Sequence, residues 1–296
     1  MDHKTVLAAL SSERKQELTA RSDRAGILHL ASHFGAIAIC AAYIAAQGPL
    51  WGLFVPVLGV LTVFLFTLIH ECTHYTPFEN KALNDAVGHL VSVPLMLPFV
   101  WFRYFHLAHH KYTNDPENDP ELAGEGRPTT WKAYLIYMSG WGYWSGNVRT
   151  LWTNAWGTID APYLPPRQHS AMRFEARVLL GIYACALISL FFSPLVLWLW
   201  IIPCLIAQPA LRLYLLAEHG HCPPVADMLE NSRTTYTVRL VRWLAWNMPY
   251  HAEHHAFPAV PFHKLPDLHQ EVQSHLKSTS DGYGAFTRDY VARLEH

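Results

Sequence analysis

The sequence predicts an all-α integral membrane protein with four transmembrane helices as two hairpins, interfacial and re-entrant helices, and a cytosolic helical cap. Residues 25–69 and 178–211 contain no Asp, Glu, Lys or Arg. Because one crossing takes about 20 residues, each of these stretches is long enough for a pair of spans. Three short histidine clusters lie at the ends of the expected spans or in the segments beyond them.

We expect three regions along the chain. Residues 1–24 are polar and mixed in charge, and they form a cytosolic leader. Residues 25–217 form the transmembrane region, which includes an interfacial and cytosolic insert at about 70–177. Residues 218–296 are polar enough to form a cytosolic cap. The net charge of −1 gives no indication of a nucleic-acid partner.

Each hairpin consists of two apolar spans joined by a short, uncharged turn. The first hairpin pairs residues 26–46 with 53–69, and the second pairs 174–192 with 195–217. The basic residues outside the spans all fall on the side opposite to the two turns. By the positive-inside rule, both termini and all three histidine clusters then lie in the cytosol.

The apolar segment 86–102 is too short for an ordinary crossing and contains Pro94 and Pro98. If it crossed the membrane, the clusters at His70 and His106 would lie on opposite sides and could not share a site. We therefore expect this segment to dip into the membrane and return.

Residues 131–156 are rich in Trp and Tyr, interleaved with Lys132 and Arg149. This composition is typical of helices that lie at the level of the lipid headgroups. An aromatic soluble core is the alternative interpretation.

The histidine clusters have the spacing of metal ligands on one face of a helix. Side chains at i, i+3 and i+4 are neighbours there, with Cβ atoms about 5–6 Å apart. Neutral imidazole binds iron, zinc and copper. A lone histidine is more often a solvated side chain, but three clusters of one spacing indicate a metal site. The clusters are His70 and His74; His106, His109 and His110; and His251, His254 and His255. Eight imidazoles exceed the ligands that one ion takes, so we expect two metal ions.

Taken together, the clusters resemble the histidine boxes of the membrane-bound fatty acid desaturase and hydroxylase superfamily. The pattern of that superfamily is His-x(3,4)-His, His-x(2,3)-His-His and His/Gln-x-x-His-His. The resemblance covers about residues 25–270 and includes the flanking segments 111–119 and 247–251. The fatty acid desaturase branch is the most similar, through Phe257-Pro258 and the segment 261–266.

The resemblance implies a non-haem di-iron centre that activates O2 and removes hydrogen from an unactivated C–H bond of a lipid acyl chain. Desaturation is the expected reaction, and hydroxylation or ketolation of an alkyl chain or carotenoid is the alternative. Electrons would come from a separate ferredoxin, rubredoxin or cytochrome b5, because the chain has no His-Pro-Gly-Gly haem motif and no Cys-x-x-Cys pair. We also expect an apolar substrate tunnel between the spans and the cap.

The resemblance assigns the eight clustered histidines as ligands and adds a ninth at the cytosolic end of the fourth span. His219 occupies that place, and we expect it to be the ligand in preference to His221. Acyl-CoA desaturases have an Asn one turn earlier that contacts iron through water. Leu215 stands there in this chain, and Asn247 is a candidate substitute.

A ligating histidine also needs a partner for its other ring nitrogen. Arg212 and Glu218 lie near the end of the fourth span, where an ionisable residue is seldom without a function. Further candidates are the carboxylates and amides within or beside the clusters: Glu71, Asn114, Asp115, Asp119, Asn247 and Glu253.

Two other classes of protein fit part of the pattern. His70-Glu71-x-x-His74 matches the His-Glu-x-x-His motif of zinc proteases, in which the Glu acts as a general base. That class leaves the clusters at 106–110 and 251–255 unexplained. A metal transporter would place its site near the bilayer midplane, whereas these clusters lie at the ends of spans.

Overall fold

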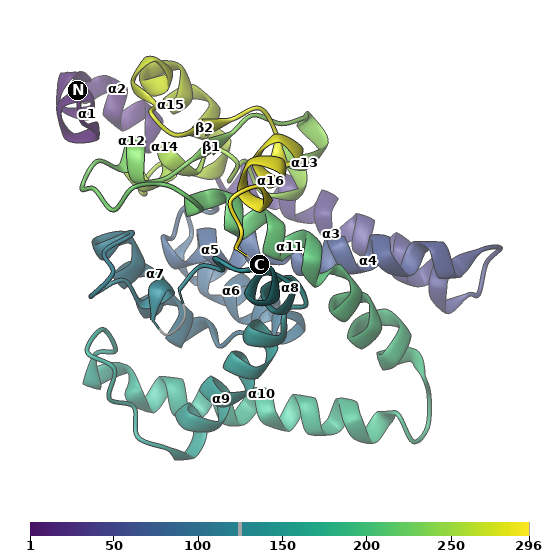
Figure 1. Ribbon diagram of the computed structural model, residues 1–296. Coiled ribbons are helices and arrows are strands. Elements are labelled where there is room, and N and C mark those ends of the chain that lie inside the picture. The colour runs from purple at the N-terminus through teal and green to yellow at the C-terminus, as the bar shows by residue number, and fades with distance from the viewer. Residues whose placement is uncertain (124–125, 296) are drawn as a thin grey trace.

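The computed structural model describes residues 1–123 and 126–295, and this part of the chain is mostly helical (Figure 1). Its one sheet pairs the parallel strands β1 (Thr234–Thr235) and β2 (Thr279–Ser280). The predicted all-α class is therefore confirmed. The α-helices, in chain order, are α1 (His3–Ala9), α2 (Ser12–Leu18), α3 (Asp23–Ala45), α4 (Phe54–Val63), α5 (Leu65–Thr73), α6 (Lys81–Leu95), α7 (Phe99–Tyr112), α8 (Trp131–Met138), α9 (Trp141–Trp156), α10 (His169–Ser189), α11 (Ile202–His219), α12 (Met228–Asn231), α13 (Arg239–Leu244), α14 (His251–Ala256), α15 (Leu265–Val272) and α16 (Tyr283–Val291).

Three helical stretches of the described chain are long and apolar enough to cross a membrane, which indicates a membrane protein. They contain α3, then α4 with α5, and then α11 with the π-helical turn that precedes it. α10 covers the remaining predicted span, but Arg173, Glu175 and Arg177 lie in its first half, so it is less apolar than the others. The three stretches are Ser12–Ala45, Trp51–Thr73 and Leu197–His219.

The helices α6 and α7 meet at a bend of 98°. Pro94 lies near the end of α6, and Met96 directly after that helix has a left-handed backbone with φ 53°. Together the two helices are apolar enough to form either a broken span or a re-entrant segment. The bend falls inside residues 86–102, the segment that the sequence predicts to dip and return.

The carboxylate of Glu175 defines where α7 begins. Pro98 precedes the helix and provides no capping side chain. Instead Glu175, on α10, accepts hydrogen bonds from the backbone N–H groups of Phe99 at 3.0 Å and Val100 at 2.9 Å. It also lies 2.7 Å from His89 Nδ1. A carboxylate at a helix N-terminus satisfies unpaired N–H groups and interacts favourably with the helix dipole. These contacts account for a buried carboxylate in an otherwise apolar region.

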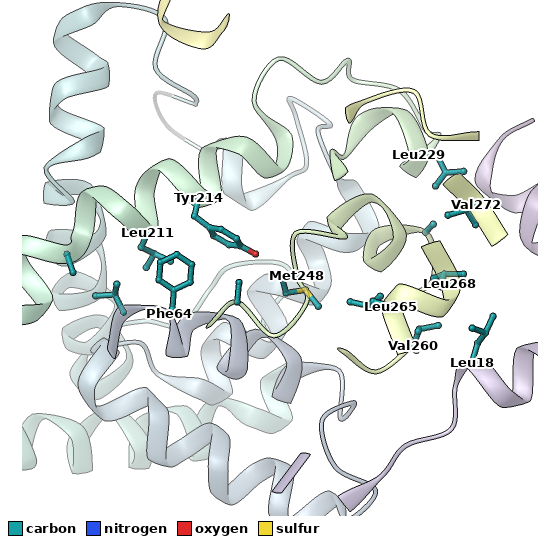
Figure 2. Packing of buried hydrophobic residues seen from close by; sticks show 14 of the residues in the cluster. Leu18, Phe64, Leu211, Tyr214, Leu229, Met248, Val260, Leu265, Leu268 and Val272 are labelled. Carbon is teal, nitrogen blue, oxygen red and sulfur yellow. The ribbon is translucent and has the colours of Figure 1, made fainter. Parts of the chain in front are cut away.

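A buried core joins the spans to the C-terminal cap. α11 packs along α4, and Gly59 allows a close approach, because a Cβ there would lie 2.1 Å from the carbonyl oxygen of Pro203. Further along, the rings of Phe64 and Tyr214 meet edge to face with centroids 5.1 Å apart. Figure 2 shows the same core continuing through Met248 into the cap. The cap is therefore packed onto the spans and not merely tethered to them.

We expect Gly59→Ala to lower the unfolding temperature, because the added methyl group would overlap the Pro203 carbonyl and push α4 away from α11. Overpacking of this kind costs about 1–3 kcal/mol. The measurement is thermal unfolding of the purified protein in detergent. Gly35→Ala is the matched control, since Gly35 lies in α3 and an added Cβ there meets nothing within 4 Å. Equal unfolding temperatures for the two variants would contradict the close α4–α11 contact.

Candidate metal centre

The nine histidines expected as ligands come together in two groups. Within each group, one ring nitrogen of every member lies within 4.8 Å of the corresponding nitrogens of the others. His221 lies elsewhere, with its ring stacked on that of Tyr290 at a centroid distance of 4.3 Å. The first group is His70, His74, His106, His110 and His254; the second is His109, His219, His251 and His255.

Helical phase divides the clusters between the two groups. On α7, the i, i+4 pair His106 and His110 joins the first group, and His109 turns to the second. On α14 the arrangement is reversed, because the i, i+4 pair joins the second group and His254 joins the first. The ends of α5 and α11 complete the first and second groups, respectively. Each group therefore needs helices that are far apart in the sequence.

Ring nitrogens from different helices face one another at short range. Two imidazole nitrogens bound to one ion at about 2.1 Å and at right angles stand roughly 3 Å apart. The observed separations therefore suit donor atoms around a shared ion. The Nε2–Nε2 distances are 3.0 Å for His74 and His106, 3.1 Å for His110 and His254, 3.2 Å for His109 and His219, and 2.9 Å for His219 and His251.

In the second group, acceptors hold the Nδ1 atoms and leave Nε2 available to a metal. His109 Nδ1 donates to the Asp119 carboxylate, 3.0 Å from Oδ1 and 3.1 Å from Oδ2. His219 Nδ1 donates to the backbone carbonyl of Asn231 at 3.2 Å. Partners of this kind determine the tautomer and the orientation of a ligating imidazole.

Of the other two members of the second group, His255 has an Nδ1 acceptor, whereas His251 Nδ1 lies near a carboxylate without a hydrogen bond to it in the described chain. Thr113 donates its hydroxyl hydrogen to the His109 carbonyl at 2.8 Å, so its oxygen accepts from His255 Nδ1, 3.1 Å away. Glu218 Oε1 lies 3.3 Å from His251 Nδ1. Asp119 and Glu218 are among the residues expected from the sequence, whereas Thr113 and the Asn231 carbonyl are not. Thr113 lies one turn after His109, and this spacing could have predicted its contact. No sequence pattern predicts the position of a backbone carbonyl.

The first group has fewer partners within the described chain. Both ring nitrogens of His70 and the Nδ1 atom of His110 are buried and have no hydrogen-bond partner among the described residues. His254 Nδ1 lies 3.9 Å from Glu71 Oε1. Burial of polar atoms without partners is unfavourable. One ring nitrogen of His70, gathered among converging imidazoles, therefore fits a metal ion as its partner, and His110 faces the group with Nε2.

Burial favours the form of the imidazoles that can bind a metal. It lowers the pKa of His251, His254 and His255 well below the usual value for histidine, because the charged form loses its hydration. The neutral ring has a lone pair to offer to a metal ion. All three histidines of α14 are therefore ready to act as ligands near neutral pH.

Two residues expected beside the histidines form other hydrogen bonds, one within a turn and one to a distant backbone carbonyl. The Asp115 carboxylate accepts from the backbone N–H of Glu117 at 3.0 Å and the side-chain amide of Asn118 at 2.8 Å. Asn247 donates to the Phe262 carbonyl at 3.0 Å and has φ 58°. Short Asn and Asp side chains commonly bond nearby backbone in turns. Neither residue hydrogen-bonds a clustered histidine within the described chain, and their roles beside the metal centre stay predictions.

Asn114 acts one step away from a ligand candidate, whereas Glu253 bonds residues that belong to neither group. Asn114 Nδ2 donates at 2.6 Å to the same Asn231 carbonyl that accepts from His219. Glu253 is fully buried but pairs with His269 Nδ1 and with the hydroxyl of Thr234. It lies two residues after the start of α14 and so points to the face opposite His251. A direct contact of either residue with a clustered histidine is therefore not observed in the described chain.

Glu71 is buried between α5 and the cap. Its Oε2 atom accepts from the Thr76 hydroxyl at 2.9 Å and from the backbone N–H of Phe262 at 3.1 Å. Its neighbours His70 and His74 share their group with three imidazoles from α7 and α14. A zinc protease needs this Glu free to act as a general base, so the geometry does not fit that class.

A cavity of about 420 Å³ adjoins both groups. Its wall includes members of each group and many aromatic and aliphatic side chains. Charged side chains of four described residues also line it, so its wall is more polar than that of the apolar tunnel expected from the sequence. These charged residues are Glu121, Arg127, Arg212 and Glu218.

The chain is similar to desaturases along most of its length. A family model described as fatty acid desaturase matches residues 48–287. A dihydrorhizobitoxine desaturase from Bradyrhizobium elkanii is 26% identical over 89% of this chain and 80% of the relative. An omega-3 fatty acid desaturase from Caenorhabditis elegans is 27% identical over 82% of this chain and 66% of the relative. An sn-1 oleoyl-lipid 12-desaturase from Arthrospira platensis is 25% identical over 70% and 64%. The chain spans slightly less than two thirds of the latter two relatives.

We expect His219→Ala to lose most of the metal bound by the second group, because His219 Nε2 faces both His109 and His251. The measurement is metal per protein by mass spectrometry after purification. His221→Ala is the control, since His221 stacks on Tyr290 and belongs to neither group. Full metal content in His219→Ala, or an equal loss in both variants, would contradict the assignment.

We expect Asp119→Ala to weaken metal retention about 10–100-fold, the usual effect of removing a carboxylate that orients a ligating histidine. The matched control is Asp115→Ala, because both carboxylates also accept hydrogen bonds from backbone N–H groups of the same turn. The measurement is loss of bound metal against a graded chelator series. If both variants lose metal alike, the effect belongs to the turn and not to His109.

Proposed function

The chain belongs to the fatty acid desaturase family and is an oxidoreductase, and from that premise we propose that it uses O2 and two iron ions to oxidise an unactivated C–H bond in a lipid acyl chain. The proposal depends on one observation, the pair of all-imidazole groups beside a common cavity. We propose desaturation as the reaction, and the names of the three relatives, all desaturases, support it over hydroxylation or ketolation.

We propose the nine grouped histidines as the iron ligands, five around one ion and four around the other. Imidazole is a suitable ligand for iron, and the buried His70 ring, with no hydrogen-bond partner among the described residues, supports a metal in the first group. When bound, the iron pair would supply the activation of O2 and the removal of hydrogen from carbon.

The protein's own groups would orient the ligands and restrict water. Asp119 and the Asn231 carbonyl hold His109 and His219 with Nε2 directed into the second group. Aromatic side chains such as Phe102 line the cavity beside the histidines and keep much of its wall apolar. A dry, shaped cavity favours oxidation of the bound substrate over side reactions with water.

We further propose four spans, with the metal centre and both termini in the cytosol. α3 with α4–α5 would form one hairpin and α10 with α11 the other, and the bent α6–α7 pair would be re-entrant. Two features support this arrangement. The turns after α3 and α10 both lie on the right in Figure 1. The histidines of α5 and α11 lie at the helix ends opposite to those turns. The exposed Trp side chains of α8 and α9 would lie at headgroup level.

We propose that electrons arrive from a separate protein of the ferredoxin, rubredoxin or cytochrome b5 type. His74 and His110 are half-buried, whereas the other ligand candidates are buried. A hollow of about 710 Å³ reaches His74, and Arg21 and Arg103 are among its lining side chains. A donor seated over this hollow would approach the first group closely, which supports entry at this point.

We expect cells that express the wild-type chain to contain new lipid double bonds, and cells that express His109→Ala to lack them. His109 is a member of the second group whose Nδ1 atom is held by Asp119. The measurement is mass spectrometry of total lipids, with His221→Ala as the control that should resemble the wild type. Added oxygen in place of double bonds would mean a hydroxylase or ketolase. Identical lipid profiles for wild type and His109→Ala would contradict the proposed activity on these lipids.

A further inference from the structure

The charged side chain of Arg212 forms no ion pair with the described residues of the chain. Arg212 lies on α11, inside the apolar stretch Leu197–His219, and lines the cavity. Its Nε and Nη2 atoms are buried and have no hydrogen-bond partner among the described residues. The guanidinium lies against the ring of Tyr143, with Cζ 4.7 Å from the ring centroid. A charged group at this depth is costly unless it is paired, so the site favours an acceptor supplied by a ligand.

Two carboxylates among the described residues of the cavity wall lie beside the histidines. Glu218 Oε1 lies 3.3 Å from His251 Nδ1, and Glu121 Oε2 lies 3.6 Å from His109 Nδ1. Arg127 also lines the cavity, and its charge acts on His109, His219 and His251. Neither carboxylate forms an ion pair with Arg212, whose guanidinium therefore suits an anion.

The position of Arg212 on α11 sets the distance between its guanidinium and the metal centre. Arg212 and His219 are seven residues apart, which places them on nearly the same helix face with a rise of about 10 Å between them. Leu215 and Leu216 lie between them and also line the cavity. Tyr214 points away from this face and packs on α4, as Figure 2 shows. The cavity therefore follows one face of α11 from Arg212 to the second histidine group.

We propose that Arg212 binds an anionic oxygen group of the substrate, and that the carbon to be oxidised lies on the same molecule about two helical turns away, roughly 10 Å along α11. The inference rests on the proposed function and adds the substrate class, an alkyl chain bearing a carboxylate or phosphate at that distance. A guanidinium forms paired, charge-assisted hydrogen bonds with either group. A neutral ester in the same place would leave the charge of Arg212 without a counter-ion.

The test is equilibrium binding of labelled dodecanoate to the iron-loaded, purified protein in neutral lipid nanodiscs, with competition by dodecyl phosphate and by methyl dodecanoate. We expect wild-type protein to bind at least one of the two anions about tenfold or more tightly than the ester. Arg212→Gln should remove that preference and Arg212→Lys should retain part of it. Arg149→Gln is the control, since Arg149 is exposed on α9 and does not line the cavity. The stronger of the two anions identifies the group that Arg212 binds.

Equal binding of anion and ester by the wild type would overturn the inference, whether or not the variants fold. So would an unchanged anion preference in Arg212→Gln at normal iron content, or no saturable binding of either anion. These outcomes are separate from lipid oxidation. If the wild type forms double bonds but shows no preference for anions, the proposed function stands and this inference fails. If Arg212 binds anions but no lipid is oxidised, this inference stands and the proposed function fails.

Discussion

The structure depends on nine imidazole rings, seven buried and two half-buried, that come together in two groups. In each group, Nε2 atoms from different helices approach to about 3 Å. Polar nitrogens removed from water need partners on both sides of the ring. In the second group the protein supplies Nδ1 acceptors to three of the four rings, which are the carboxylate of Asp119, the hydroxyl of Thr113 and the carbonyl of Asn231. The Glu218 carboxylate lies 3.3 Å from Nδ1 of the fourth ring, His251. These neighbours leave Nε2 directed inward, where a bound metal ion would be the partner on the inner side of the rings.

This requirement explains several features that lie away from the histidines. α7 contributes to both groups, so its phase and starting point must be well defined, and the buried carboxylate of Glu175 caps its first N–H groups from a different helix. The turn 115–119 returns the chain so that Asp119 reaches His109, and Asp115 holds that turn without touching the ligands. Residues that support the site thus act by positioning backbone as much as by direct contact.

α11 connects the metal centre to the rest of the molecule through its two faces. One face packs on α4, where Gly59 permits a close approach and Tyr214 meets Phe64. The other face runs along the cavity from Arg212 to His219. A helix packed firmly on one side can hold a charged side chain and a ligand candidate at a constant separation on the other. The same packing that stabilises the spans therefore sets the distance between Arg212 and the second histidine group.

The amino-acid sequence by itself determined the helical class, the apolar stretches and the ligand candidates, because run length and i, i+3, i+4 spacing are local properties of a helix. It also indicated the bend between α6 and α7, since His70 and His106 cannot meet across a bilayer. The tertiary structure alone decided that His106 and His110 belong to one histidine group and His109 to the other. It also decided that Thr113 and the Asn231 carbonyl accept from ligand candidates, and that Asn247 and Glu253 bond residues outside both groups. It also added Glu121 and Arg127 to the cavity wall, where the sequence had already indicated a function for Arg212 and Glu218. These outcomes depend on the rotation and packing of helices far apart in the chain, and a local pattern carries no record of either.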